Sequence, residues 1–383
     1  MLGVCLKYEQ KNYGSKLQAL ATVRMFEKLG VDYRIIRYNK KDLRFVIKSI
    51  PRIFNWVFIN DRYLEIQRKL AFKKHPDVLE KVNLRNKTFD SFDIHFENNL
   101  SPVYKNYNEL KQNCGNDYTQ VITCSDQLWS PSALASNFYN LMFAPDDMPK
   151  TSWGSSFGVS QIPWYQKGRT KKYLNRIENI SMRENQGAVI VKNLINRDVP
   201  VLMDPVFALS RDEWDELVPV AEPEWDSYIF CYFLGNNPEH RAAARELAAK
   251  TGKKIVTLRH LDCFVKSDED FGDIAPYDVD PVRFLNILRG ADYVCTDSFH
   301  GTAFSIIFEK DFTVFDRYNN NSKNSKNSRI QSLCENLSLQ NRRFAGEGIS
   351  TDKIDYAAVS QTVAEYRAKT EQYLKDSLTK EKL

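Results

Sequence analysis

The chain has 383 residues, which favours two domains, and its 43% hydrophobic and 27% charged residues are typical of a soluble globular protein. The 54 basic and 49 acidic residues leave a net charge of +5, too weak to indicate nucleic acid binding by bulk attraction. No segment reaches the roughly 18 apolar residues of a membrane span. The seven cysteines form no C-x-x-C pair, so they indicate neither a zinc site nor a disulfide framework.

The first part of the chain predicts a parallel sheet. Residues 2–7 form a short apolar run, apolar residues recur at helical spacing between 17 and 29, and residues 32–38 alternate as in a strand. A strand–helix–strand unit of this kind pairs its strands in parallel. Further strands are expected at 118–124, 152–157 and 179–182.

A second unit of the same kind follows later. Residues 228–259 again read as strand, turn, Ala-rich helix and strand, although the residues themselves do not repeat. We therefore predict an α/β protein with two Rossmann-like domains that face each other across a cleft. The expected parts are an N-terminal domain at 1–205 with a helical insertion at about 40–99, a C-terminal domain at 206–345, and a terminal helix within 346–383 that packs back on the first domain.

Two polar segments follow expected strands of the first domain. Asn12-Tyr13-Gly14-Ser15 follows the first strand, and Ser125-Asp126-Gln127-Leu128-Trp129 follows the strand that ends at Cys124. Ligands of parallel sheets gather at the carboxyl ends of strands. A carboxylate, an amide and an indole together would suit a sugar, but turn formation and helix capping are the ordinary alternatives.

Arginines near expected strand or loop ends are candidates for binding an anion. Arg183 follows the strand predicted at 179–182. Arg317 lies at the start of a polar loop at 316–326 that could close over a ligand, and Arg329 lies just beyond it. A planar guanidinium suits carboxylate and phosphate groups. A surface ion pair is the alternative for each of them.

The strongest candidate is a histidine in the second domain. A buried strand at 293–296 is followed by Asp-Ser-Phe-His-Gly-Thr at 297–302 and then by an apolar helix at 303–308. His300 would lie at the start of that helix, where the helix dipole attracts an anion. A histidine among small polar residues at a strand–helix turn favours a functional role.

Together these motifs resemble the polysaccharide pyruvyl transferase family. The residues that carry the resemblance run from residue 12 to about residue 330. They are Asn12-Tyr13-Gly14-Ser15-Lys16-Leu17-Gln18, Ser125-Asp126-Gln127-Leu128-Trp129, Ser155-Ser156-Phe157-Gly158, Ser181-Met182-Arg183-Glu184, Asp204-Pro205, Tyr232-Phe233-Leu234-Gly235 and Thr296-Asp297-Ser298-Phe299-His300-Gly301-Thr302.

The resemblance implies a fold similar to the two-domain GT-B glycosyltransferases. It also implies transfer of an enolpyruvyl unit from phosphoenolpyruvate to a sugar, which forms a pyruvate ketal and releases phosphate. By the same resemblance, His300 matches the family's catalytic histidine and Arg183 its donor-binding arginine. The place of a further basic donor ligand is open between Arg317 and Arg329.

The remaining site residues are expected from this chemistry. Asp126 would hold or deprotonate a sugar hydroxyl, and Trp129 would stack on the sugar face. The helix start with Ser298, Gly301 and Thr302 would help to bind the donor. The acceptor side would be completed by Asn12, Tyr13 and Gln127. The reaction requires no metal and no cofactor, since phosphoenolpyruvate is a co-substrate.

Two other functions stay open, a nucleotide-sugar glycosyltransferase and a non-catalytic saccharide-binding protein. Residues 1–6 lack the basic start and the small-residue cleavage site of a signal peptide, so we expect a cytoplasmic protein. The expected partners are phosphoenolpyruvate and a saccharide, with no nucleic acid. A lipid-linked acceptor would place the protein at the inner membrane face by peripheral contact, without a transmembrane segment.

Overall fold

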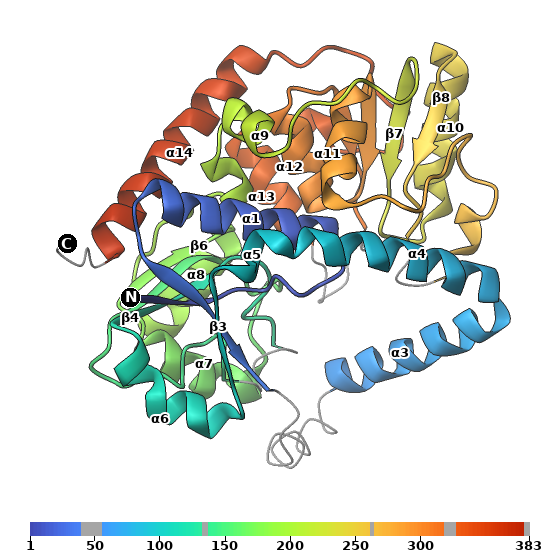
Figure 1. The fold of residues 1–383 in the computed structure, drawn as a ribbon. Helices are drawn as coiled ribbons and strands as arrows, with labels where there is room; N and C mark the ends of the chain where they lie inside the picture. The colour runs from blue at the N-terminus through green and yellow to red at the C-terminus, as the bar shows by residue number, and fades with distance from the viewer. Residues whose placement is uncertain (40–55, 132–136, 261–263, 318–326, 379–383) are drawn as a thin grey trace.

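A computed structural model of the chain describes residues 1–39, 56–131, 137–260, 264–317 and 327–378. These residues form two α/β units, each built on a parallel sheet with helices on its faces (Figure 1). The predicted fold class of two Rossmann-like domains is thereby confirmed.

The first sheet has the strand order of the Rossmann fold. Its strands, in chain order, are β1 (Leu2–Cys5), β2 (Tyr33–Tyr38), β3 (Leu100–Tyr104), β4 (Gln120–Cys124), β5 (Lys150–Ser155) and β6 (Asn179–Met182). They pair in the order β3-β2-β1-β4-β5-β6, all in parallel. Every residue of β1, β4 and β5 is buried, as expected for a sheet covered on both faces.

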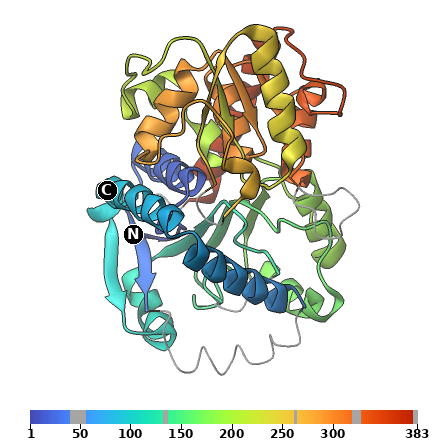
Figure 2. The same cartoon turned by 90° about the vertical axis from the view of Figure 1, so that its right-hand side faces the viewer.

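The helices of this domain are α1 (Tyr13–Lys28), α6 (Tyr107–Asp117), α7 (Lys167–Leu174) and α8 (Asn185–Ile195). The expected insertion contains α3 (Trp56–Lys74), α4 (Pro76–Phe92) and the short α5 (Ile94–Glu97), while its part at 40–55 lies outside the described residues. Helices α3 and α4 form a hairpin that projects from the first domain and passes under the second (Figures 1 and 2).

The second sheet is smaller. Its strands are β7 (Tyr228–Tyr232), β8 (Lys254–Thr257), β9 (Tyr293–Thr296) and β10 (Phe312–Val314), in the parallel order β10-β9-β7-β8. The helices of this domain are α10 (Pro238–Thr251), α11 (Pro281–Gly290), α12 (Phe299–Ile307) and α13 (Ser328–Asn336). The segment before β7 contains the 3-10 turn η4 (Pro205–Ala208) and α9 (Arg211–Leu217).

The C-terminal helix α14 (Tyr356–Ser377) runs from the second domain back to the first (Figure 1). Near its end, the Tyr373 hydroxyl donates to the carbonyl of Ser152 at 2.8 Å, and the carbonyl of Ser377 accepts from the Gln120 amide at 2.6 Å. These contacts attach the helix to strands β4 and β5.

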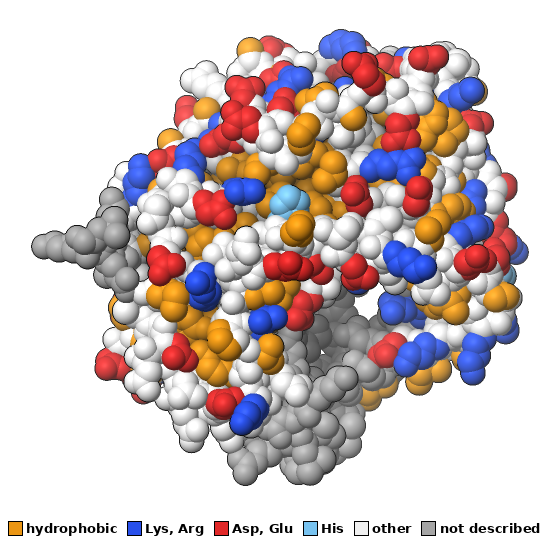
Figure 3. Space-filling model, in the orientation of Figure 1, with side chains coloured by type: hydrophobic (Ala, Val, Ile, Leu, Met, Phe, Trp, Pro, Cys, Tyr) orange, Lys and Arg blue, Asp and Glu red, His pale blue; other side chains and the backbone are white. Residues whose placement is uncertain are grey.

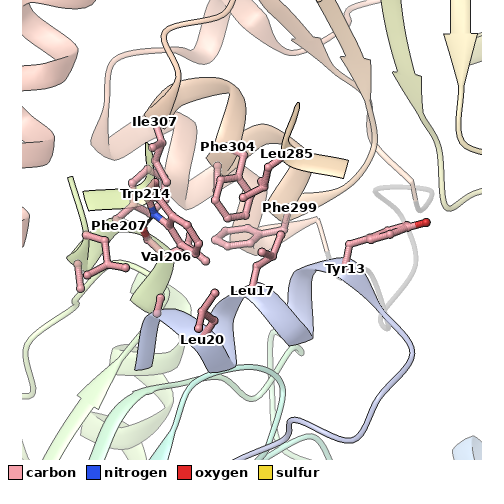
Figure 4. Packing of buried hydrophobic residues seen from close by; sticks show 14 of the residues in the cluster. Tyr13, Leu17, Leu20, Val206, Phe207, Trp214, Leu285, Phe299, Phe304 and Ile307 are labelled. Carbon is pink, nitrogen blue, oxygen red and sulfur yellow. Dashed lines mark hydrogen bonds between the residues drawn. The ribbon is translucent and has the colours of Figure 1, made fainter. Parts of the chain in front are cut away.

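One continuous apolar core joins the two domains through α1. Figure 4 shows Leu17 and Leu20 of α1 directed toward Val206, Trp214 and the helices of the second domain. Both leucines are fully buried, and truncation of such a side chain to alanine costs about 2–5 kcal/mol. The domains therefore share a packed interior as well as a connecting segment.

Three details differ from the sequence prediction. Strands β3 and β10 were not predicted, because β3 contains Pro102 and β10 has only three residues. Helix α12 begins at Phe299, four residues before the apolar run at 303–308. His300 consequently lies in the first turn of the helix, where its position is fixed by the helix backbone.

Candidate active site

In each parallel sheet there is one topological switch point, the place where the strand order reverses, and the two switch points lie at the same site. In the first sheet the strand order reverses between β1 and β4, which are followed by Lys7 and Asp126. In the second it reverses between β7 and β9, and His300 lies just after β9. Ligands of open parallel sheets bind outside such points. Phe299 packs against Arg183 of the first domain, 4.9 Å from ring centroid to guanidinium, so both switch points face one site.

Asp297 fixes the loop that carries the histidine. Its carboxylate accepts from the backbone N–H groups of Leu234 at 2.6 Å and Gly235 at 2.8 Å, which follow β7. The Arg317 guanidinium donates to the Asp297 carbonyl at 2.9 Å, and its aliphatic part packs against Gly235. Arg317 is thus engaged in building the loops after β7 and β9.

A buried carboxylate lies at the centre of the site. Asp204 follows Val201, which forms a bridge to the end of β6, and its side chain has no exposed surface. One carboxylate oxygen lies 2.5 Å from Nη1 of Arg183, accepts from Ser125 at 3.2 Å, and lies 3.6 Å from Nε2 of His300. Sequence reasoning did not select Asp204 as a site residue, although the Asp-Pro string was among the family motifs.

The charge state of Asp204 follows from its neighbours. Burial by itself raises the pKa of a carboxyl group, but His300 and Arg183 outweigh it and hold the pKa of Asp204 below its usual range. The side chain is therefore an anion at neutral pH.

His300 is enclosed by both domains. Its side chain is 11% exposed, and Nε2 has no hydrogen-bond partner among the described residues. On the other side of the ring, a Cβ atom added to Gly14 of α1 would lie 2.0 Å from Nδ1. The absence of a side chain at Gly14 is what lets α1 approach the imidazole.

Asp126 stands on a strained turn. Ser125 and Asp126 both have left-handed backbone angles, with φ of 40° and 62°, a conformation that costs of order 1–3 kcal/mol for each non-glycine residue. The turn directs the Asp126 carboxylate toward Lys7 Nζ at 3.0 Å and Arg183 Nη2 at 4.0 Å. Burial opposes ionisation, but Lys7, Arg183 and Arg329 keep the pKa of Asp126 below its usual range.

Two arginines meet over one aromatic ring. The guanidinium groups of Arg183 and Arg329 lie 4.9 Å and 5.6 Å from the centroid of Phe299. Arg329 forms no hydrogen bond or ion pair with the described part of the chain, and its Nε is buried. Burial and the nearby Arg183 lower the pKa of Arg329 to about 10, which still leaves it charged at neutral pH. The pair brings two guanidinium groups to one aromatic ring.

The small polar residues around His300 build the turn. Ser298 Oγ accepts from the N–H of Gly301 at 3.3 Å, and the Thr302 hydroxyl donates to the carbonyl of Ser298 at 3.0 Å. A Cβ atom on Gly301 would lie 2.6 Å from Oγ1 of Thr296. Ser298, Gly301 and Thr302 thus cap and pack the helix start. Their expected part in donor binding stays a prediction.

Two of the four predicted acceptor residues have other roles. Trp129 has no exposed surface, its indole N–H donates to the carbonyl of Tyr139 at 3.0 Å, and its ring packs against Phe157. It cannot stack on a sugar in this structure. Tyr13 stacks on Phe284 of the second domain with 4.7 Å between centroids. An aromatic side chain after a strand can equally well fill a core, so the acceptor role of both residues stays a prediction.

The other two predicted acceptor residues have polar side chains. Asn12 is the N-cap of α1, where its side-chain oxygen accepts from the N–H of Ser15 at 3.1 Å. Gln127 follows Asp126 and packs against Gly158, and its amide nitrogen is buried without a hydrogen bond to a described residue. Gln127 therefore has a buried amide N–H group that no described residue accepts.

A cavity of about 390 Å³ lies beyond Lys7, at the carboxyl ends of β1 and β2. Lys7 connects it to the centre of the site, since the same side chain lines the cavity and binds Asp126. The other lining residues combine aromatic and charged side chains; they include Tyr8, Glu9, Arg37, Tyr38, Phe138 and Tyr139. Sequence reasoning had no signal for this cavity, because its residues come from three separate segments.

Among the described residues, no three His, Cys, Asp or Glu side chains are grouped as a metal site would require. In the same part of the chain, none of the helices combines the length and the apolar character needed to cross a membrane.

A comparison with known protein families matches residues 12–319 to the family described as polysaccharide pyruvyl transferase. None of the curated proteins matches the chain.

Similar solved structures include UDP-GlcNAc 2-epimerase from Neisseria meningitidis bound to UDP-GlcNAc, at 10% identity and a TM-score of 0.47 over 97% of this chain and 93% of that one. MurG from Acinetobacter baumannii has 9% identity and a TM-score of 0.39 over 97% and 94%. The wall teichoic acid polymerase TagF has 11% identity and a TM-score of 0.42 over 98% and 83%. At these values none of the three supports an argument about function.

Proposed function

We propose, since this chain belongs to the polysaccharide pyruvyl transferase family, that it transfers the enolpyruvyl group of phosphoenolpyruvate to a sugar of a cell-surface polysaccharide precursor. The product is a pyruvate ketal, and phosphate is released. The observation that carries the proposal is the pair of guanidinium groups of Arg183 and Arg329 over Phe299, next to His300; the buried Nε of Arg329 has no hydrogen-bond partner among the described residues.

The donor needs this kind of cationic site. Phosphoenolpyruvate carries a carboxylate and a phosphate, and guanidinium groups bind both in a planar, two-pronged geometry. Arg183 already pairs with Asp204 at 2.5 Å, whereas Arg329 interacts with Asp126 and Glu184 only at longer range, and its Nε has no hydrogen-bond partner in the described part of the chain. An anionic donor would supply the missing partner.

His300 is the candidate proton donor. As a first sugar hydroxyl bonds to C2 of the donor, the vinyl carbon C3 takes a proton, for which His300 Nε2 is the candidate acid, because it has no hydrogen-bond partner among the described residues. The ionised Asp204 lies 3.6 Å from the same nitrogen and would orient the ring. The hydroxyl loses its proton to a base as its oxygen bonds to C2. Return of a proton to His300 then restores the acid.

Asp126 is the candidate partner for the sugar. Its carboxylate is ionised and can accept a hydrogen bond from the attacking hydroxyl or take its proton. In the second step another hydroxyl of the same sugar bonds to C2, the bond from C2 to the phosphate oxygen breaks, and phosphate leaves with the proton. The developing positive charge on C2 would be stabilised by the donor's own carboxylate.

The cavity next to Lys7 would hold the acceptor. Its volume is ample for a sugar ring, and aromatic walls with a few charged groups are typical of pockets that orient a small polar molecule. The cytoplasmic location and the lipid-linked acceptor remain part of this proposal. The donor is a metabolite of the cytoplasm, so the site would have to face that compartment.

The test is phosphate release from phosphoenolpyruvate in the presence of galactosides, glucosides or mannosamine derivatives. We expect sugar-dependent release by the unaltered protein and a loss of about 10²–10⁴-fold in His300→Ala. Full turnover by that variant would refute the acid–base role. No release with any acceptor, together with binding of a nucleotide sugar, would support the glycosyltransferase function, while sugar binding alone would support a non-catalytic protein.

A further inference from the structure

Helix α3 has an apolar stripe that no part of the described structure covers. Ile59, Tyr63, Ile66 and Leu70 are 43%, 58%, 56% and 48% exposed. They are spaced by four, three and four residues, which places them within an arc of about 60° on a helix with roughly 100° per residue. The stripe is about 16 Å long. Scattered exposed apolar side chains need no explanation, but a continuous stripe indicates an interaction surface.

Basic side chains border this stripe. Lys69, Lys73 and Lys74 are exposed and lie within about 90° of its centre on the same helix. Over residues 65–74 there are four basic residues and one acidic residue, Glu65, which pairs with Lys69 at 3.3 Å. Figure 3 shows Lys and Arg side chains over the α3–α4 hairpin.

The position of the helix leaves the surface accessible. Helices α3 and α4 form the projecting hairpin, and they lie on the side of the molecule that faces the viewer in Figure 2. By contrast, the similarly apolar α1 is buried by both domains. The stripe on α3 therefore lacks, within the described residues, the kind of partner that α1 finds.

We propose that α3 lies along the surface of an anionic phospholipid bilayer. Its apolar stripe would enter the boundary between head groups and acyl chains, and its lysines would bind the negatively charged head groups. A second copy of the chain is the competing occupant; the cluster of lysines beside the stripe favours the anionic bilayer, and the test below separates the two. The inference goes beyond the proposed function, since it requires neither donor nor acceptor.

The test is co-sedimentation of the full chain with vesicles of phosphatidylcholine, with and without phosphatidylglycerol. We expect binding only to the anionic vesicles and weakening by salt. The double variant Ile66→Asp, Leu70→Asp should reduce the binding at least about tenfold. Replacing Lys73 or Lys74 by Gln should reduce it about fivefold each. Val189→Asp, which changes a 48% exposed residue on α8, is the matched control and should bind normally.

Equal binding by the double variant and the unaltered chain would overturn the proposal, as would no binding to anionic vesicles. A dimer in light scattering that the double variant disperses would also overturn it, in favour of a second copy. Phosphate release with a soluble acceptor should be the same in the double variant and the unaltered chain. Vesicle binding is measured without donor or acceptor, so it can be interpreted even if the proposed function is wrong.

Discussion

The two domains contribute different things to the site. The first supplies fixed charges: Arg183, Asp204 and Asp126 are held by one another and have little or no exposed surface. The second supplies groups with bonding capacity that the described residues leave unused, namely His300 Nε2 and the guanidinium of Arg329. Neither half is complete alone. We call Arg183, Asp204 and Asp126 the charged frame. The comparison indicates that this frame fixes the positions of the groups that would bind and protonate a substrate.

The largest effect on stability should come from breaking the frame. Asp204→Asn would leave Arg183 as a buried charge without its main partner, and the loss should be about 3–5 kcal/mol of unfolding free energy. Urea unfolding would measure this loss. A combined Arg183→Met, Asp204→Leu variant should recover much of the stability but no phosphate release. Unchanged stability in Asp204→Asn would contradict the central role of this pair.

The frame also makes a prediction about pH. The pKa values of Asp126 and Asp204 are lower in the folded chain than the ordinary value of 3.8, so their stabilising effect is present above about pH 4. It should be lost as the pH falls from about 4 toward the lowered values, because the unfolded chain then binds more protons. Unfolding followed from about pH 7 to about pH 2 would show a steep fall, and Asp204→Asn should flatten it.

The second arginine over Phe299 should decide donor affinity. Arg329→Gln is expected to raise the KM for phosphoenolpyruvate about tenfold to a hundredfold, since a hydrogen bond to a charged group contributes about 1.5–3 kcal/mol. Arg317→Gln is the matched control: it should disturb the loop at Asp297 while changing donor KM far less. A larger rise in donor KM in Arg317→Gln than in Arg329→Gln would assign the donor role to Arg317.

The contact between the domains at His300 gives a subtler test. Gly14→Ala would force the imidazole to move, because the added carbon would overlap Nδ1. We expect kcat to fall about tenfold or more with little change in donor KM, since Arg183 and Arg329 are untouched. Gly115→Ala on α6, whose added carbon would lie 3.4 Å from Pro145, is the control and should behave as the unaltered chain.

The smallest effect concerns the buried indole. Trp129→Phe should lower the free energy of unfolding by about 1–3 kcal/mol, because the indole hydrogen bond to Tyr139 is lost, and leave the acceptor KM unchanged. Steady-state kinetics with the best acceptor would check this. A large rise in acceptor KM at unchanged stability would restore the sugar-stacking role.

Sequence reasoning located most of the strands and the loops that follow them, because apolar runs and turn residues mark these locally. It therefore found Asp126, Arg183 and His300, which each come shortly after a strand. It could not tell which polar atoms the fold uses internally, as at Ser298 and Thr302. Nor could it find Asp204 as the partner of Arg183 and His300, or the cavity beyond Lys7, because both depend on segments that meet only in three dimensions.

The position of α1 has a consequence for how the chain is made. Leu17 and Leu20 emerge from the ribosome early, but the α12 side chains that cover them follow roughly 280 residues later. At about 5–20 residues per second, that face stays incompletely covered for roughly 15–55 seconds of synthesis. The nascent first domain therefore exposes part of an apolar helix throughout this interval. A truncated chain that ends before α12 should bind chaperones.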